Sequence, residues 1–420
     1  MVFAYLLEYN RYMNIIGIFV VLAIAFLFSK NRRAINYKLV INALLLQMVV
    51  GWITLRTSVG QRIVQSIADG VTVIYNCADA GASFVFGNLN NPTLPWGFIF
   101  AIKVLPIIIF FGALMAILFH YGIIQRIVAV IGYGVQPLLG TSGAETLCAV
   151  ANSFLGQTEA PLLIRNYLST MTKSELFVVM VSGMGTVSGA ILAVFGEIGV
   201  PMVHLLTASV MAIPGSILIA KILVPEEEKT KTGGSTTLVC EQTSGTIFDA
   251  ISVGTSDGLQ LALNVGAMLI SFLSLIALVN YLLGATSQTL NYYLADIKVQ
   301  LPQLSLNYIF SRLFAPFGYL LGFTGNDALR AGELLGTKVT INELIAYSEM
   351  VKMDLSARVT SIMTYALCGF SNFSCIGIQI GGIGALVPAK RTWLCQLGLY
   401  AVLGGSLSNL LSALIAGLLL

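Results

Sequence analysis

Long uncharged runs of apolar residues are the feature that most constrains this chain. A helix needs about 20 apolar residues to cross the roughly 30 Å hydrocarbon core of a bilayer, and a closed helix satisfies the backbone there. Such runs cover residues 12–29, 39–55, 104–125, 176–196, 198–220, 259–295, 359–389 and 392–420. The sequence therefore predicts an all-α integral membrane protein with about eight transmembrane helices.

Composition leads to the same prediction. Of the 420 residues, 57% are hydrophobic and 10% are charged, whereas soluble domains carry about 25% charged residues. With 22 basic and 19 acidic residues the net charge is only +3, which gives no broad basic surface. We therefore expect a lipid bilayer around the protein and no nucleic acid as a partner.

Cysteines and histidines predict no metal centre. The six cysteines are scattered without paired spacing, and His120 and His204 each lie alone in an apolar run. Zinc sites need several such ligands close together. We interpret the cysteines as small core residues.

Basic residues predict the orientation in the membrane. The densest short basic loop spans residues 30–38, a second basic turn is formed by Lys390 and Arg391, and such loops stay in the cytoplasm. No cleavage pattern follows the first apolar run, so we expect it to be retained. We predict a multi-pass protein of the cytoplasmic (inner) membrane with both termini outside, since an even number of spans returns the chain to its starting side.

Two stretches have the pattern of interfacial helices. Residues 60–86 and 245–260 combine apolar residues at helical spacing with charged ones, which is typical of helices that lie along a membrane surface. The polar segment 225–247 is predicted to be a linker.

Two regions are apolar enough to enter the membrane but are interrupted too often to cross it as one helix. In residues 141–172 a polar tip at 156–159 is followed by Pro161, and residues 313–350 contain Glu343 near a second polar segment. Helices that turn back before crossing fit this pattern. We predict two re-entrant helical hairpins.

A long span with small and polar residues at its centre follows each predicted hairpin. The interruptions lie at residues 182–189 and 368–375, and a complete span follows each one. The chain thus repeats the order hairpin, broken helix, whole helix. An odd number of spans separates the hairpin tips, so the second unit should enter from the opposite side, as in inverted-repeat transporters.

The interruptions are also where binding is expected. Helix ends near the bilayer midplane leave backbone groups free to act as ligands, although small residues also allow close helix packing. A charge at mid-bilayer costs at least about 2.5 kcal/mol, so Glu159 and Glu343 need polar partners or a wet cavity. We predict a functional role for both. Other charges are predicted to pair with one another or lie at helix ends (Arg165, Arg312, Arg330, Glu333, Lys338, Lys352, Asp354, Arg358) or at the interface (Glu145, Glu197).

Three classes of function remain open at this point. A membrane-embedded enzyme could use Glu159 and Glu343 as acid and base, but no nucleophile or metal constellation accompanies them. A passive channel would use a polar midplane without needing paired hairpins. A solute transporter accounts for both features, and we expect no enzyme.

Three segments then resemble one known family. GQTEAPL (156–162), GTKVTINELIAY (336–347) and CGFSNFSCIGIQIGGIG (368–384) are similar, in this order, to segments of bacterial concentrative nucleoside transporters. The similarity of layout extends over nearly the whole chain, including ASFVFG at 82–87. The resemblance implies a homotrimer with a fixed scaffold and a moving unit that carries the solute as an elevator.

The resemblance also divides the chain. Residues 1–125 would be scaffold spans with the interfacial helix 60–86, and residues 225–300 would be the linker, a second interfacial helix and another scaffold span. Residues 126–224 would be the first transport repeat (hairpin 141–172, broken helix 173–199, helix 200–224), and residues 301–420 the second (hairpin 303–350, broken helix 354–384, helix 390–418).

Substrate contacts follow from the same resemblance. It implies that a nucleoside such as uridine binds through its base at Gln157, Thr158, Glu159 and Ile191, and through its ribose at Glu343, Asn372 and Cys375. A carboxylate can accept hydrogen bonds from two vicinal hydroxyls. Cys375 departs from the family, where serine is usual, and a thiol is a weaker donor.

The family resemblance also implies a site for a coupling ion. The resemblance places sodium at the Asn152 side chain, the Leu155 carbonyl, the Thr186 hydroxyl and the Val187 carbonyl. These are four neutral oxygens, the ligand type that hard cations prefer. Proton coupling is the alternative, because Glu159 or Glu343 could titrate.

Overall fold

The computed structural model describes residues 2–91, 93–230, 245–294 and 302–420. Every regular element in these ranges is a helix, which confirms the all-α prediction. Most of the predicted linker 225–247 lies outside the described residues. The α-helices are α1 Val2–Leu7, α2 Arg11–Leu27, α3 Tyr37–Arg56, α4 Ser58–Phe86, α5 Phe100–Lys103, α6 Leu105–His120, α7 Ile123–Leu139, α8 Gly143–Ala151, α9 Arg165–Leu168, α10 Lys173–Gly185, α11 Gly189–Glu197, α12 Met202–Leu223, α13 Ile247–Leu294, α14 Leu306–Leu313, α15 Ala315–Leu320, α16 Gly325–Thr340, α17 Glu343–Met350, α18 Ala357–Leu367, α19 Phe373–Leu386 and α20 Arg391–Leu419.

Seven helical stretches among the described residues are long and apolar enough to cross a membrane. They coincide with seven of the eight predicted runs. The eighth, residues 359–389, is divided between α18 and α19, because its small and polar centre forms a non-helical segment at Cys368–Asn372. The predicted interruption therefore exists, and it removes this run from the uninterrupted spans.

Helix α20 forms the centre of the packed body. It contacts α2, α10, α12, α18 and α19. Its glycines permit this: a Cβ on Gly405 would lie 2.9 Å from the Cβ of Met184 on α10, closer than side chains normally approach. The most apolar windows of α10–α11 and α20 are 89% and 78% buried, against 28% for α3, so α3 lies at the periphery.

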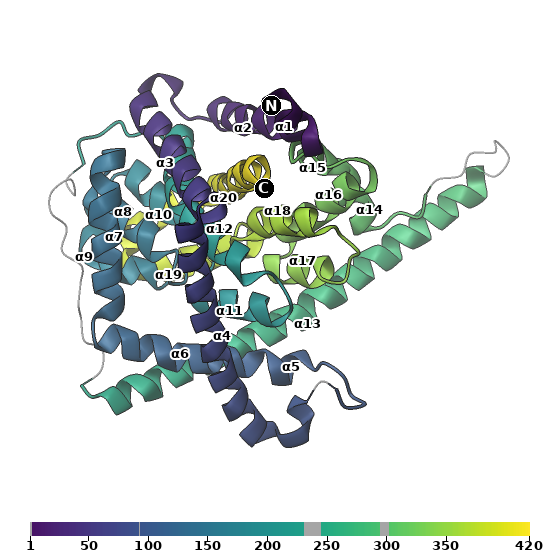
Figure 1. Ribbon diagram of the computed structural model, residues 1–420, viewed down its shortest axis with the longest axis horizontal. Helices are drawn as coiled ribbons and strands as arrows, with labels where there is room; N and C mark the ends of the chain where they lie inside the picture. Colours follow the sequence, from purple (N-terminus) through teal and green to yellow (C-terminus); the bar gives the residue numbers. More distant parts are fainter. Residues whose placement is uncertain (1, 92, 231–244, 295–301) are drawn as a thin grey trace.

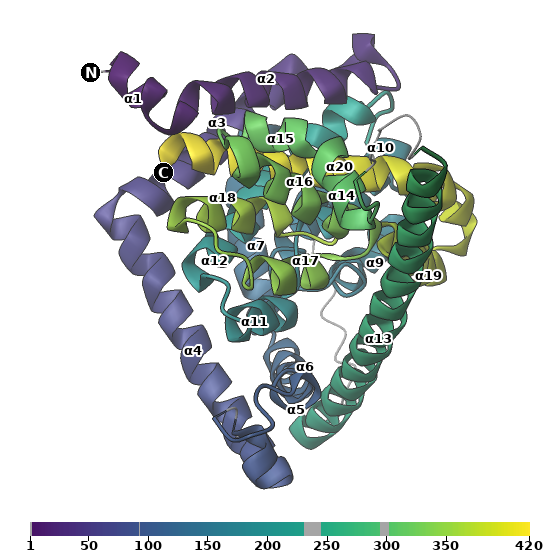
Figure 2. The ribbon, with the colours of Figure 1, turned by 90° about the vertical axis from the view of Figure 1, so that its right-hand side faces the viewer.

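Two long helices, α4 and α13, flank this body on opposite sides and converge near α5 and α6 (Figure 2). Helix α13 has 48 residues and is therefore about 70 Å long at 1.5 Å per residue. The prediction of a separate interfacial helix at 245–260 was wrong, since this segment is the first part of α13. This part of α13 packs closely against α6, since a Cβ on Gly254 would lie 2.5 Å from the Gly112 carbonyl oxygen.

Each predicted hairpin contains short helices that could not span a bilayer core. In 141–172 they are α8, a 3₁₀ turn at Ala160–Ile164 and α9. In 303–350 the structure has four helices, because α14 and α15 precede α16 and α17. Helix α7 was not predicted as a separate element; Gly122, with φ 68°, ends the preceding turn and lets it begin.

The two ends of the chain lie together (Figure 1). The Tyr5 hydroxyl donates to the Leu418 carbonyl at 2.7 Å, and the Arg11 guanidinium donates to the Leu420 carbonyl at 3.0 Å. Both termini are therefore at one face of the molecule.

Candidate solute and ion site

The two broken helices meet at their interruptions. Helix α10 ends at Gly185 and α11 begins at Gly189, while α18 ends at Leu367 and α19 begins at Phe373. The Phe370 backbone N–H donates to the Thr186 carbonyl at 3.2 Å. The centres of the two repeats are thus joined directly through the backbone.

Asn409 of α20 holds both interruptions from one side. Its Nδ2 donates to the Gly185 carbonyl at 2.7 Å and to the Cys368 carbonyl at 2.6 Å. Its Oδ1 accepts from the Lys338 ammonium at 2.7 Å. The Ser371 hydroxyl also donates to Oδ1, at 3.3 Å. All four contacts are buried, because Asn409 and Lys338 are each 1% exposed.

Glu343 and Asn372 lie at the N-terminal ends of two helices, α17 and α19. Asn342 caps α17, of which Glu343 is the first residue, and Asn372 caps α19 with its Oδ1, which accepts from the Cys375 N–H at 3.1 Å. The Nδ2 of Asn372 donates to the Glu343 carboxylate at 3.1 Å. A carboxylate beside two helix N-termini is in a favourable electrostatic position.

The first hairpin tip reaches this pair through Gln157. The Cys375 thiol is close enough to interact with both Gln157 and Glu343, so the predicted base and ribose residues share one location. Gln157 is buried, and its Oε1 has no hydrogen-bond partner. Two glycines leave the space that the hairpin tip occupies. A Cβ on Gly183 of α10 would lie 2.9 Å from the Gln157 Cβ, and a Cβ on Gly382 of α19 would lie 2.6 Å from Thr158 Cγ2.

The remaining predicted substrate residues have other contacts. The exposed Glu159 turns its carboxylate back to the Gly156 N–H at 3.3 Å. Ile191 is buried in the main hydrophobic core, on α11. Gln157, Glu343, Asn372 and Cys375 therefore form the group that the structure brings together, with Thr158 beside α19.

The four predicted ion ligands lie where the first hairpin meets the interruption of α10. Asn152, directly after α8, donates through Nδ2 to Ser182 Oγ at 2.9 Å, and its buried Oδ1 has no hydrogen-bond partner. Thr186 follows α10 and is 1% exposed. The Gly189 N–H donates to the Phe154 carbonyl at 3.0 Å, which holds the segment with Leu155 next to the one with Val187.

This arrangement fits a monovalent cation. The orphaned Oδ1 of Asn152 is an acceptor whose direction is fixed by the Ser182 bond, and an unsatisfied buried acceptor is costly without a partner. Backbone carbonyls and a hydroxyl complete a set of neutral oxygens. No cluster of three or more His, Cys, Asp or Glu residues that could hold a metal is found in the described part of the chain.

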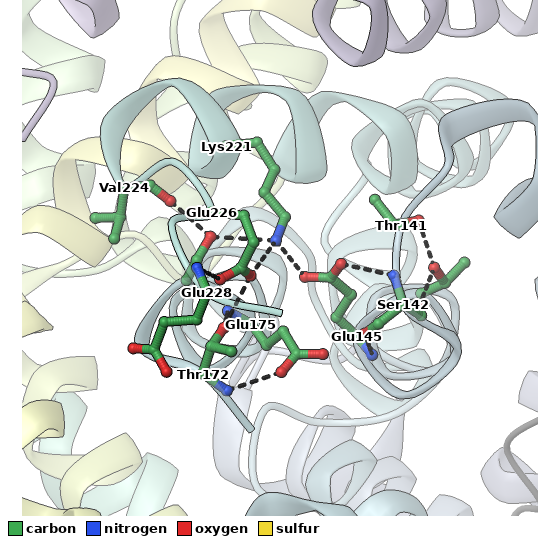
Figure 3. A network of polar contacts seen from close by, with 11 residues as sticks. Thr141, Ser142, Glu145, Thr172, Glu175, Lys221, Val224, Glu226 and Glu228 are labelled. Carbon is green, nitrogen blue, oxygen red and sulfur yellow. Dashed lines mark hydrogen bonds and ion pairs between the residues drawn. The ribbon is translucent and has the colours of Figure 1, made fainter. Parts of the chain in front are cut away.

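Glu145, which was predicted at the membrane interface, is buried inside the protein. It is 1% exposed and forms an ion pair with Lys221 at 2.8 Å (Figure 3). Glu145 and Glu175 each close a capping box, at the start of α8 and α10 respectively. The Lys221 ammonium, near the end of α12, also contacts Ser174 Oγ at 3.1 Å and Glu226 at 3.3 Å. One lysine thus joins the ends of three helices.

Sequence reasoning also missed the Lys338–Asn409 contact. Lys338 lies in the last turn of α16, in agreement with the expectation of a helix end. The sequence did not predict that its ammonium would donate to two neutral oxygens deep in the body. Asn409 lies among small and apolar residues in the second half of α20. Lys338 lies inside GTKVTINELIAY, which was the available signal.

Comparison with protein families supports the same architecture. Residues 16–89 match the model described as Na+ dependent nucleoside transporter N-terminus, residues 101–202 match nucleoside recognition (Gate), and residues 204–417 match Na+ dependent nucleoside transporter C-terminus. The matches together cover nearly the whole chain and define a membrane transporter for nucleosides.

Full-length relatives agree. The chain is 38% identical to the nucleoside permease NupC of Helicobacter pylori, with 98% of each chain covered, and 42% identical to an uncharacterized transporter of Haemophilus influenzae, with 96% of this chain and 97% of the relative covered. It is 36% identical to sodium/nucleoside cotransporter 1 of Rattus norvegicus, over 96% of this chain and 63% of that longer protein.

Solved structures show the same fold. CNTnw in an inward-facing substrate-bound state matches with a TM-score of 0.90 and 39% identity over 97% of this chain and 98% of that chain. A CNTnw variant in an intermediate state matches with a TM-score of 0.92 and 38% identity, over 97% and 98%. The chain belongs to the Na+-dependent, concentrative nucleoside transporter family. It is a multi-pass membrane transporter, and its relatives are not enzymes.

Proposed function

We propose that this protein takes up nucleosides across the cytoplasmic membrane together with sodium, by an elevator-type alternating-access mechanism. The observation that carries the proposal is the meeting of the two predicted hairpins near Cys375, whose thiol interacts with the Gln157 side chain of the first and with the charge of Glu343 of the second. A nucleoside has a base and a sugar to be recognised, and the two sides of this group offer different chemistry for them.

The base would be bound from the first hairpin. Gln157 offers an amide, Thr158 a hydroxyl and Glu159 a carboxylate, which together can match the donors and acceptors of a base edge such as that of uridine. Ile191 would supply apolar contact. The free Oε1 of Gln157 supports this assignment, because it is a buried acceptor that still needs a donor.

The ribose would be bound from the second hairpin. Asn372 uses its Oδ1 within its own helix and its Nδ2 on Glu343, so this bond orients the carboxylate toward the sugar. Glu343 would accept from the vicinal hydroxyls. Cys375 would contribute a thiol where a hydroxyl is usual, so its contact with the sugar is the weakest of the three.

Sodium would be bound beside the first hairpin. Asn152 Oδ1, the Thr186 hydroxyl and the carbonyls of Leu155 and Val187 would replace part of its water shell. Because these residues connect the first hairpin to the interruption of α10, ion binding would hold the hairpin in the form that receives the nucleoside. A proton-coupled symporter is the alternative, favoured by the buried Glu343 carboxylate.

The larger assembly follows from the family resemblance. We propose a homotrimer in which residues 1–125 and 225–300 form the scaffold, while residues 126–224 and 301–420 move together as the transport unit. The adjacent termini support an even number of crossings, and the basic loop at residues 30–38 supports placing both termini outside.

The direct test is uptake of labelled uridine into proteoliposomes. An inward sodium gradient should drive accumulation above equilibrium, and replacement of sodium by choline should abolish it. A proton gradient without sodium is the second arm, and accumulation there would establish the proton-coupled alternative. Uptake that depends on neither gradient would refute active transport.

A further inference from the structure

Lys338 carries a buried positive charge that the proposed transport mechanism does not use. It lies on α16 and is 1% exposed. Its ammonium donates to the Ala366 carbonyl at 2.8 Å and to Asn409 Oδ1 at 2.7 Å, distances typical of charge-assisted hydrogen bonds. Both acceptors are neutral. A buried charge held by neutral oxygens rather than by a carboxylate is coordinated in the way a metal cation would be.

The position of this ammonium corresponds to that of the proposed sodium. In each repeat a helix of the predicted hairpin packs against the first half of the broken helix: α8 against α10, and α16 against α18. Asn152, at the end of α8, faces the last turn of α10. Lys338, near the end of α16, reaches Ala366 in the last turn of α18. Carbonyl ends of helices attract positive charge, so both repeats offer a cation position at the same point.

We propose that Lys338 is a tethered cation that occupies, in the second repeat, the position that the coupling sodium occupies in the first, and that it positions the sodium site through Asn409. This inference rests on the proposed sodium coupling. Lys338 is a positioning residue, because it contacts neither the nucleoside residues nor the ion ligands by hydrogen bond.

Asn409 provides the connection between the two positions. Its amide can present Oδ1 to only one side, and the ammonium fixes that side. Nδ2 is thereby directed to the carbonyls of Gly185 and Cys368. Gly185 directly precedes Thr186, a proposed sodium ligand. Without the ammonium, Oδ1 keeps only the Ser371 hydroxyl at 3.3 Å as a donor, and the amide is held less firmly against the end of α10.

Glu343 is the other charged group that acts on this ammonium. Loss of Lys338 therefore also changes the field at the proposed ribose site, and the test must separate the two effects. The sodium concentration at half-maximal uptake reports on the ion site, and the KM for uridine at saturating sodium reports on the nucleoside site.

The experiment compares wild type, Lys338→Met, Lys338→Ala and the exposed control Lys352→Ala in proteoliposomes. Lys338→Met removes the charge and leaves an unbranched side chain that is one heavy atom shorter. We expect its half-maximal sodium concentration to rise about tenfold or more, within the 5–150-fold range typical of coupling between sites, with a smaller change in the KM for uridine. Lys352→Ala should match wild type.

Chemical rescue distinguishes a cation from a structural side chain. Lys338→Ala lacks a propylammonium group, so added propylammonium should restore part of the sodium affinity, whereas the neutral propanol should not. Should Lys338→Met aggregate, Lys338→Ala purified with propylammonium gives the same comparison.

Three outcomes decide between the proposals. An unchanged sodium dependence in Lys338→Met overturns the inference, and so does a loss of uptake that propylammonium does not reverse. A wild-type protein without sodium dependence instead overturns the proposed function, since that arm contains no substitution.

Discussion

At the scale of single residues, the pair Glu343 and Asn372 shows how helix capping can prepare a binding group. Asn372 must use Oδ1 to cap α19, which leaves Nδ2 free to donate to the carboxylate. The carboxylate therefore has one defined donor and retains further lone pairs for other donors. Capping of one helix thus orients a side chain that begins another.

We expect Glu343→Gln to weaken uridine binding about 10- to 100-fold, because a hydrogen bond to a charged group contributes roughly 1.5–3 kcal/mol. Binding to the purified protein can be measured by calorimetry. The control is 2′,3′-dideoxyuridine, which lacks both vicinal hydroxyls of the sugar and should lose little affinity on this substitution. An equal loss for the two nucleosides would contradict the assignment of the ribose to Glu343.

The sequence was informative for residues that interrupt apolar runs and uninformative for Asn409. Gln157, Glu343 and Asn372 lie in polar segments where a continuous span would be expected, so the interruption itself drew attention to them. Asn409 lies within a long apolar span, and its partners are the main-chain carbonyls of Gly185 and Cys368, which no residue identity reveals. Only the folded arrangement shows that contact.

At the scale of elements, the seating of the first hairpin depends on two glycines on neighbouring helices. Gly183 of α10 faces Gln157 and Gly382 of α19 faces Thr158. The hairpin of one repeat is therefore in contact with the broken helix of the other. Sequence could predict the hairpin and the broken helix, but their contact required the three-dimensional packing.

Gly382→Val should lower uridine uptake at least about tenfold, because its Cβ would lie 2.6 Å from Thr158 Cγ2 and displace the tip. Gly381→Val is the matched control: the same helix gains the same side chain, but nothing lies within 4 Å of an added Cβ. Uptake is measured on equal amounts of reconstituted protein. Similar uptake by both variants would show that the tip does not need this close contact.

The boundaries of helices are harder to predict from sequence than their existence. The residues of 245–260 alternate polar and apolar in a way that suits a surface helix, and this pattern was correctly read as helical. Continuation into the following span depends on packing of Gly254 and Gly258 against α6, which a local pattern does not contain. For the same reason α14 and α15 were merged into the second hairpin.

At the scale of the whole molecule, the packed body is held together by buried charges as well as apolar contacts. Lys221 joins α8, α10 and α12 through Glu145, Ser174 and Glu226 (Figure 3). The basic loop reaches the same end of the body, since the Lys30 N–H donates to the Leu223 carbonyl at 2.9 Å. Stability of the entire fold should therefore depend on this cluster.

Lys221→Met should destabilise the protein by about 3–5 kcal/mol, because removing one partner leaves the Glu145 charge buried without compensation. The thermal midpoint in detergent measures this. The double variant Lys221→Met, Glu145→Gln should recover part of the loss, since the uncompensated charge is gone while an amide oxygen can still cap α8. A double variant no more stable than the single one would show that the ion pair is not the source.

The bond between Phe370 and Thr186 restricts how the transporter can open. If the two repeats moved apart at this point, this backbone bond and the bond from Asn409 to the Gly185 carbonyl would break in the buried interior, at about 1–3 kcal/mol for each unsatisfied group. Neither hairpin tip is restrained by that bond. The solute should therefore enter and leave by movement of a hairpin tip. The contact between the two helix interruptions should stay intact throughout the cycle.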